Sequence, residues 1–140
     1  MTFKQQMHNL RKVLGMETAI VARIEDGNYE IVELDSDLPV FNVGDQFELC
    51  NTYCTAVYTS QETIVYNNVG EIEEMLLHPV YVAMQLLSYI GTPIYQDGEL
   101  WGTLNFSATE ARNKDFDYKD IKTVEQLAKL YGQERIAASV

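Results

Sequence analysis

The stretch SYIGTPIYQDGELWGTLNFS, residues 88–107, decides the fold of this chain. Residues 88–95 and 99–107 are rich in strand-forming side chains, and they flank the dipeptide Asp97-Gly98. Asp-Gly between two such runs favours a tight hairpin turn, because glycine readily adopts the positive φ angle that the turn requires. The stretch therefore predicts two antiparallel strands joined by a short turn.

The second of these strands has two different faces. Strict alternation places four side chains on one face: Trp101, Thr103, Asn105 and Ser107. It places three on the other: Gly102, Leu104 and Phe106. The second face is apolar enough to be covered by helices, whereas small polar groups between larger side chains favour a ligand cavity over a solid core. We therefore interpret the hairpin as the floor of a binding pocket.

Composition and charge narrow the class of protein. The chain has 140 residues, 46% of them hydrophobic, which fits one domain over residues 1–140. Its formal net charge of −11 argues against binding to nucleic acid or to an anionic membrane, because both need clustered Lys and Arg. No apolar run approaches the ~20 residues that span a bilayer. Two cysteines form no disulfide framework, so we expect a cytoplasmic protein.

Helical and extended patterns alternate along the rest of the chain. An apolar stripe predicts a first helix over residues 3–14 that ends at Gly15. Asn51 is expected to cap a helix within residues 49–58, which places Cys54 in its first turn. The other predicted elements are a hairpin of residues 17–25 and 28–35, a strand at 63–66, helical regions at 71–78 and 79–86, and a last helix at 117–136.

Two charged clusters are interpreted as solvated surface. Four side chains of the first predicted helix are expected to face water: Lys4, His8, Arg11 and Lys12. Three acids match no calcium-binding loop spacing and are assigned to a solvated turn: Glu33, Asp35 and Asp37.

Several ordered motifs resemble the GAF domain family. They are GDQF at residues 44–47, LCNTYC at 49–54, the central hairpin, and Arg112, Phe116 and Asp120 ahead of the last helix. The similarity runs from about Leu14 to Gln133. GTLNFS, together with the ending LAKLYGQER, is most similar to GAF domains of sensor histidine kinases.

The resemblance implies an α+β, PAS-related fold. Its twisted antiparallel sheet of five to six strands would carry the terminal helices on one face and a ligand pocket with short helices on the other. It implies a non-enzymatic domain of a bacterial signal-transduction protein that senses a small molecule and controls a histidine kinase or similar output module, in the same chain or another. The last helix has no Gly or Pro stop near residues 133–136, so we expect it to continue into another domain. Apolar stripes within residues 3–14 and 121–131 predict a homodimer through the terminal helices.

The predicted pocket involves ten residues. Parity places five of them on the central hairpin: Tyr89, Gly91, Thr103, Asn105 and Ser107. Five more would form the roof: Cys54, Val57, Tyr58, Tyr81 and Met84. The expected occupant is an unidentified small organic ligand, and no cofactor is assigned. A collapsed core at these positions would instead make the domain a ligand-free dimerisation spacer.

Cys54 supports a different alternative. A thiol in the first turn of a helix is exposed to the positive end of the helix dipole, which lowers its pKa. A GAF-fold thiol redox enzyme that uses Cys54 is therefore the competing function. Covalent bilin is not expected, because the sequence has no Cys-His dipeptide. A cyclic nucleotide remains an alternative ligand, on a partial match of residues 113–116 with Asp120 to GAF domains that bind one. His78 has no Cys or second His nearby to complete a haem or metal site.

Overall fold

A six-stranded antiparallel sheet is the centre of the structure, a computed structural model that describes residues 1–139 apart from the side chains of Tyr81 and of residues 135–139. The strands run in the order β3-β2-β1-β6-β5-β4, and every neighbouring pair is antiparallel. Their bounds are β1 Thr18–Glu25, β2 Asn28–Ser36, β3 Gln46–Glu48, β4 Ile64–Tyr66, β5 Ser88–Gln96 and β6 Glu99–Ala108. The predicted number of strands and their antiparallel arrangement are confirmed.

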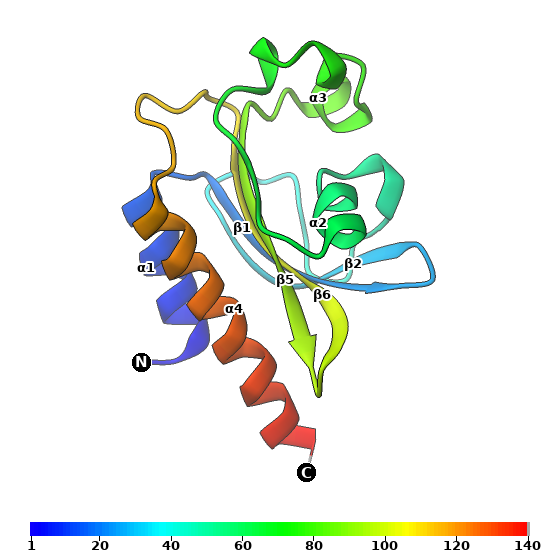
Figure 1. Ribbon diagram of the computed structural model, residues 1–140, viewed down its shortest axis with the longest axis vertical. Coiled ribbons are helices and arrows are strands. Elements are labelled where there is room, and N and C mark those ends of the chain that lie inside the picture. The colour runs from blue at the N-terminus through cyan, green and yellow to red at the C-terminus, as the bar shows by residue number, and fades with distance from the viewer. Residues whose placement is uncertain (140) are drawn as a thin grey trace.

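Helices cover the two faces of this sheet separately, as Figure 1 shows. The first and last helices, α1 (Phe3–Leu14) and α4 (Tyr118–Ser139), lie together on one face. The short helices α2 (Cys54–Ser60) and α3 (Pro79–Met84) lie on the other. Three single 3₁₀ turns complete the second layer: Leu49–Asn51, Val69–Glu71 and Glu73–Met75. The predicted α+β arrangement is therefore confirmed.

Both predicted Asp-Gly hairpin turns form. Asp26 and Gly27 have φ angles of 52° and 76°, and Asp97 and Gly98 have φ angles of 53° and 79°. Two consecutive positive φ angles define the primed turn whose twist matches that of the flanking strands. These two turns set the register of β1 against β2 and of β5 against β6.

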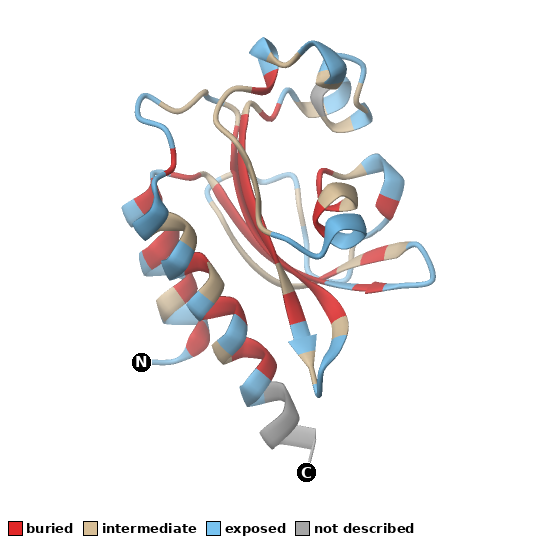
Figure 2. Cartoon of the chain, viewed as in Figure 1, coloured by how far each residue is buried: buried red, intermediate tan, exposed pale blue. Residues whose placement is uncertain are grey.

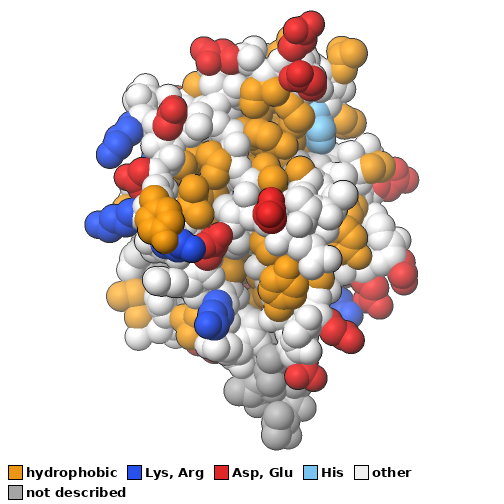
Figure 3. All heavy atoms as spheres, viewed as in Figure 1, with side chains coloured by type: hydrophobic (Ala, Val, Ile, Leu, Met, Phe, Trp, Pro, Cys, Tyr) orange, Lys and Arg blue, Asp and Glu red, His pale blue; other side chains and the backbone are white. Residues whose placement is uncertain are grey.

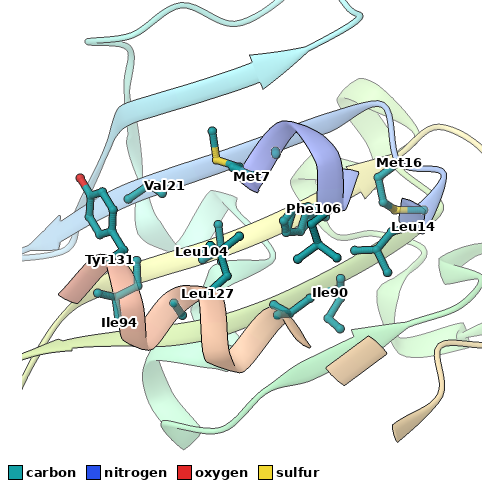
Figure 4. Close-up of a cluster of buried hydrophobic side chains, with 14 of the residues drawn as sticks. Met7, Leu14, Met16, Val21, Ile90, Ile94, Leu104, Phe106, Leu127 and Tyr131 are labelled. Carbon is teal, nitrogen blue, oxygen red and sulfur yellow. The ribbon is translucent and has the colours of Figure 1, made fainter. Parts of the chain in front are cut away.

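Apolar side chains pack between the sheet and the terminal helices. Figure 4 shows this cluster, in which Met7 and Leu14 of α1 and Leu127 and Tyr131 of α4 meet residues of the central strands. The central strands are buried along most of their length (Figure 2). The apolar stripes that suggested a homodimer are thus largely used to cover the chain's own sheet.

A β-bulge overturns the predicted position of Trp101. Ile94 pairs with Gly102 and Tyr95 pairs with Leu100, so Trp101 is an extra residue in β6. One extra residue reverses the alternation of side chains along a strand. Trp101 therefore packs beneath α4, with its ring centroid 5.7 Å from that of Tyr131, and not on the face of Thr103.

Arg11 joins the two charged clusters, which corrects its assignment to solvated surface, whereas Lys4, His8, Lys12 and Asp37 are exposed as predicted. Arg11 is only 2% exposed, and its Nε donates to Asp35 Oδ2 over 2.5 Å. Its Nη1 and Nη2 donate to Asp37 over 3.0 and 3.3 Å. His8 Nδ1 also lies 2.9 Å from Asp35 Oδ2. Since the two clusters lie more than twenty residues apart in the chain, only the folded sheet shows that they meet.

Local helix predictions are correct in part. Asn51 ends a 3₁₀ turn and is not a helix cap; Tyr53 precedes α2, which begins at Cys54. Residues 71–78 contain the end of one 3₁₀ turn and a second, Glu73–Met75, with no α-helix. The predicted helix at 79–86 is present as α3. In the described part of the chain, no helix combines the length and apolar character needed to cross a bilayer.

Candidate ligand cavity

A cavity of about 310 Å³ lies between the sheet and the layer that holds α2 and α3. Its size is near the lower limit of pockets that hold small organic molecules. The lining is Ile20, Tyr29, Ile31, Phe41, Phe47, Asn51, Thr52, Tyr53, Cys54, Pro79, Val80, Ala83, Met84, Leu86, Tyr89, Asn105 and Ser107. Apolar side chains also gather at the surface over the segment that carries α3 (Figure 3). The cavity is therefore a mostly apolar space with a few polar groups.

A buried hydrogen-bonded cluster forms one wall of the cavity. Cys54 Sγ lies 2.9 Å from Tyr89 Oη and 3.2 Å from Thr103 Oγ1. Asn105 Nδ2 donates to Cys54 Sγ over 3.4 Å and to Tyr29 Oη over 3.1 Å. Residues from β2, α2, β5 and β6 meet here, so this cluster joins the roof of the cavity to its floor.

Two polar groups on the floor, the Asn105 amide oxygen and the Ser107 hydroxyl, have no hydrogen-bond partner among the described residues. Asn105 is 4% exposed, and only one end of its amide is hydrogen-bonded among the described residues. Ser107 is 3% exposed, and its hydroxyl has no hydrogen bond to any residue the structure describes. Because both residues line the cavity, a molecule inside it can reach their free polar atoms and pair with them.

Aromatic rings hold the roof against the sheet. The Tyr53 ring centroid lies 5.5 Å from those of Tyr66 and Tyr89, in edge-to-face contacts of 72° and 80°. Its hydroxyl donates to the carbonyl oxygen of Leu86 over 2.8 Å. His78 packs 4.9 Å from the Tyr53 ring, and burial lowers the pKa of its imidazole. This histidine is thus a neutral packing residue at neutral pH.

The structure brings half of the predicted pocket residues to the cavity. Five of the ten line it: Cys54, Met84, Tyr89, Asn105 and Ser107. Thr103, Gly91 and Val57 are on the same side of the sheet but do not line the cavity, and the Tyr89 ring occupies the space where a Cβ of Gly91 would lie. Tyr58 is 36% exposed on α2 and not part of the lining, which corrects its predicted position. Tyr81 belongs to α3, but its side chain lies outside the described residues.

Sequence reasoning missed the wall contributed by the first hairpin and the loop after it. Tyr29 and Ile31 alternate on β2, and Phe41 and Phe47 come from the segment that ends in β3. The alternation of Tyr29 and Ile31 was a usable signal, since both share one face of a predicted strand. Phe41 and Phe47 carried none, because no local pattern indicates where an irregular segment folds back.

Cys54 is less acidic than its position in the chain suggests. Burial raises the pKa of its thiol and outweighs the hydrogen bonds from Thr103 and Tyr89, which act in the opposite direction. The prediction of a lowered pKa is therefore wrong, although Cys54 does begin α2. Desolvation disfavours the thiolate more than the start of a two-turn helix favours it.

We expect alkylation to distinguish the two cysteines. Iodoacetamide at about pH 7.5 should modify exposed Cys50 quickly and buried Cys54 at least ~100-fold more slowly, because the thiolate is the reactive form and must be reached. Mass spectrometry of digested protein measures both rates in one sample, with Cys50 as the internal control. Labelling of native Cys54 at a rate similar to that of Cys50 would support a thiol enzyme instead.

Comparison with known proteins supports the fold. The family model described as GAF domain matches residues 1–134, and no curated protein matches the chain. NpR6012g4, a red/green cyanobacteriochrome in its red light-absorbing state, is 18% identical with a TM-score of 0.72, over 99% of this chain and 96% of that one. JSC1_58120g3 with bound biliverdin IXa is 14% identical with a TM-score of 0.73, over 96% and 87%. The GAF domain of Acinetobacter phosphoenolpyruvate-protein phosphotransferase is 14% identical with a TM-score of 0.75, over 99% and 84%. At such identities these structures share a fold with this chain, which by itself assigns no ligand.

Proposed function

Because this chain belongs to the GAF domain family, we propose that it is a cytoplasmic, non-enzymatic sensory domain that binds a small organic molecule. Its regulatory target would be a histidine kinase or a similar output module of a bacterial signalling protein. The observation that carries the proposal is the cavity floor, where Asn105 and Ser107 are buried with unused hydrogen-bonding capacity. A bound molecule that pairs with them would lower the free energy of the liganded state.

The sheet offers a direct route from the cavity to the terminal helices. Asn105 and Ser107 of β6 line the cavity, whereas Leu104 and Phe106 of the same strand pack under α1 and α4. A shift of β6 on ligand binding would therefore change the packing of both helices. In this proposal the ligand favours one of two packings, and α4 passes the difference to the output module.

The predicted homodimer becomes part of this proposal on a different surface. Since the inner stripes of α1 and α4 cover the sheet, a partner would have to contact the outer sides of these helices. A groove between them is lined by Gln6, Leu10, Thr123, Gln126, Leu127 and Leu130.

A covalent bilin is not part of the proposal, although JSC1_58120g3 holds biliverdin. The cavity of about 310 Å³ is small for a linear tetrapyrrole. Cys54, the cysteine that lines it, has its thiol hydrogen-bonded within the wall.

A ligand screen, repeated on a variant with a bulky side chain in the cavity lining, tests ligand binding. We expect a thermal-shift screen of nucleotides, amino acids, oxoacids, tetrapyrroles and neutral aromatics to yield a compound that raises the Tm of the native protein, because it would bind the folded state alone. Ala83→Trp should reduce that shift, since Ala83 lines the cavity from α3, although its own side chain is exposed. The matched control is Val82→Trp on the same helix, where the side chain is 62% exposed and outside the lining. A shift that is undiminished in Ala83→Trp, or no shift with any compound, would contradict the proposal and favour a ligand-free spacer.

A further inference from the structure

We propose that the cavity selects an uncharged, compact aromatic molecule with one polar group that both donates and accepts hydrogen bonds. This inference rests on the proposed function, because it names the class of ligand that the same cavity would take. Three features of the lining carry it: its lack of charge, the placement of its two unpartnered polar groups, and its aromatic walls.

No charged side chain lines the cavity. Among its seventeen lining residues, all of which the structure describes, there is no Asp, Glu, Lys, Arg or His. Burial raises the pKa of Tyr29 and Tyr89 well above the usual value, so both phenols stay neutral. A carboxylate or phosphate would lose its hydration here without meeting a counter-ion, which is costly. The formal net charge of −11 disfavours anions further.

The polar groups of the floor are placed to hold one group of the ligand between them. Asn105 and Ser107 are two residues apart on β6, so they share a face at a spacing of about 7 Å. Serine can both donate and accept. The free end of Asn105 is a donor or an acceptor according to the orientation of its amide, since Tyr29 and Cys54 can pair with either end. A hydroxyl or primary amide can satisfy both residues in either orientation, whereas a carboxylate can only accept.

Aromatic rings make up much of the remaining wall. Tyr29, Phe41, Phe47, Tyr53 and Tyr89 line the cavity. The Phe47 ring contacts Tyr29 and Phe41 at centroid distances of 6.1 and 6.3 Å, with interplanar angles of 60° and 85°. Tilted and edge-to-face rings present both faces and edges to a planar guest. The volume of about 310 Å³ suits one ring or two fused rings.

A cationic guest is the strongest competing ligand class, because aromatic faces attract cations. A buried cation, however, also needs a carboxylate or several acceptors, and the lining has no carboxylate. Benzamide, benzoate and benzamidine test these alternatives, because the three molecules share a ring and nearly the same shape but differ in charge.

Calorimetric titration of the full chain tests whether the cavity prefers a neutral ligand over an ion. The titrants are these three compounds, with phenol and indole as further neutral probes. We expect at least one neutral probe to bind, and benzamide to bind at least tenfold more tightly than benzoate or benzamidine. Equal or tighter binding of either ion would overturn the neutral selectivity and leave the proposed sensory function standing. If no neutral probe binds but the wider screen finds a ligand of another class, the neutral selectivity is likewise overturned and the proposed sensory function still stands. If no compound of either set binds, the proposed function itself fails.

Asn105 and Ser107 together form what we call the polar clamp. Ser107→Ala tests it without filling or charging the cavity. We expect it to weaken the best neutral probe about tenfold, the effect of one lost hydrogen bond. The control is Ser88→Ala, the same change on β5, where the side chain faces the terminal-helix side and its hydroxyl donates to Glu110. Ser88→Ala should leave affinity unchanged even if it lowers stability. Unchanged affinity in Ser107→Ala would show that the ligand's polar group lies elsewhere and would overturn the assignment of the clamp.

Discussion

Replacing Arg11 with methionine is expected to lower the free energy of unfolding by about 3 kcal/mol, because it leaves several polar groups without their buried partner. The guanidinium binds Asp35 and Asp37 and also donates to the carbonyl oxygens of Met16 and Glu17 over 3.1 and 3.3 Å. Methionine fills much of the volume but supplies no donor. The substitution removes the ion pairs that connect α1 to the end of β2. Urea unfolding followed by circular dichroism measures the resulting loss of stability.

Arg23→Met is the matched control. Arg23 is 45% exposed, pairs with Glu25 over 2.9 Å and lies 5.9 Å from the Trp101 ring centroid, so its replacement should cost at most about 1 kcal/mol. Similar losses in the two variants would show that burial of Arg11 contributes little to stability.

The Arg11 effect should also depend on pH in a defined direction. Burial by itself would raise the pKa of Asp35, but hydrogen bonds from Arg11 and His8 outweigh it and lower the pKa below its usual value. A carboxyl whose pKa is lower in the folded state stabilises the protein above its unfolded pKa of about 3.9, and this contribution disappears as the pH falls through the folded value. The stability difference between native protein and Arg11→Met should therefore shrink below about pH 4. A constant difference from neutral to acid pH would contradict this account.

Gly102→Ala is expected to lower the free energy of unfolding by about 3 kcal/mol or more, because an added Cβ would collide with the main chain of a central strand. The Cβ would lie 1.9 Å from the carbonyl oxygen of Ala22 and 3.1 Å from Cα of Arg23. Both atoms belong to β1, which is paired on its two sides with β2 and β6 and has no free direction in which to move. Urea denaturation, with soluble yield as a second readout, measures the effect.

Gly98→Ala separates this collision from ordinary backbone strain. Gly98 has a φ of +79° in the hairpin turn, and nothing lies within 4 Å of the position of its Cβ. Alanine there should cost only about 1 kcal/mol, the strain of a left-handed conformation. If Gly102→Ala were no more harmful than Gly98→Ala, the close approach of β6 to β1 would not be a constraint.

The pocket depends on the same strand that makes Gly102 sensitive. The bulge that turns Trp101 toward α4 ends at Gly102, and the alternation beyond it directs Thr103, Asn105 and Ser107 toward the cavity side. These three polar residues therefore lie on the face that strict alternation predicts, whereas Trp101 does not. A single inserted residue changes the face of everything on one side of it and leaves the other side unaffected.

Local chemistry in the sequence determined the hairpins, the helix of residues 3–14 and the face of β6 that carries Asn105 and Ser107, because turn conformation depends on neighbouring residues and alternation holds wherever no bulge interrupts it. The tertiary structure decided which of those groups stay unpaired. Among the described residues, Asn105 has one amide end free and the Ser107 hydroxyl has no partner, because Tyr29, Cys54 and Tyr89 arrive from other elements and satisfy only part of the floor. In the same way Arg11 became a buried partner of Asp35 and Asp37. Burial and pairing are set by segments distant in the chain, and no local pattern indicates where those segments will lie.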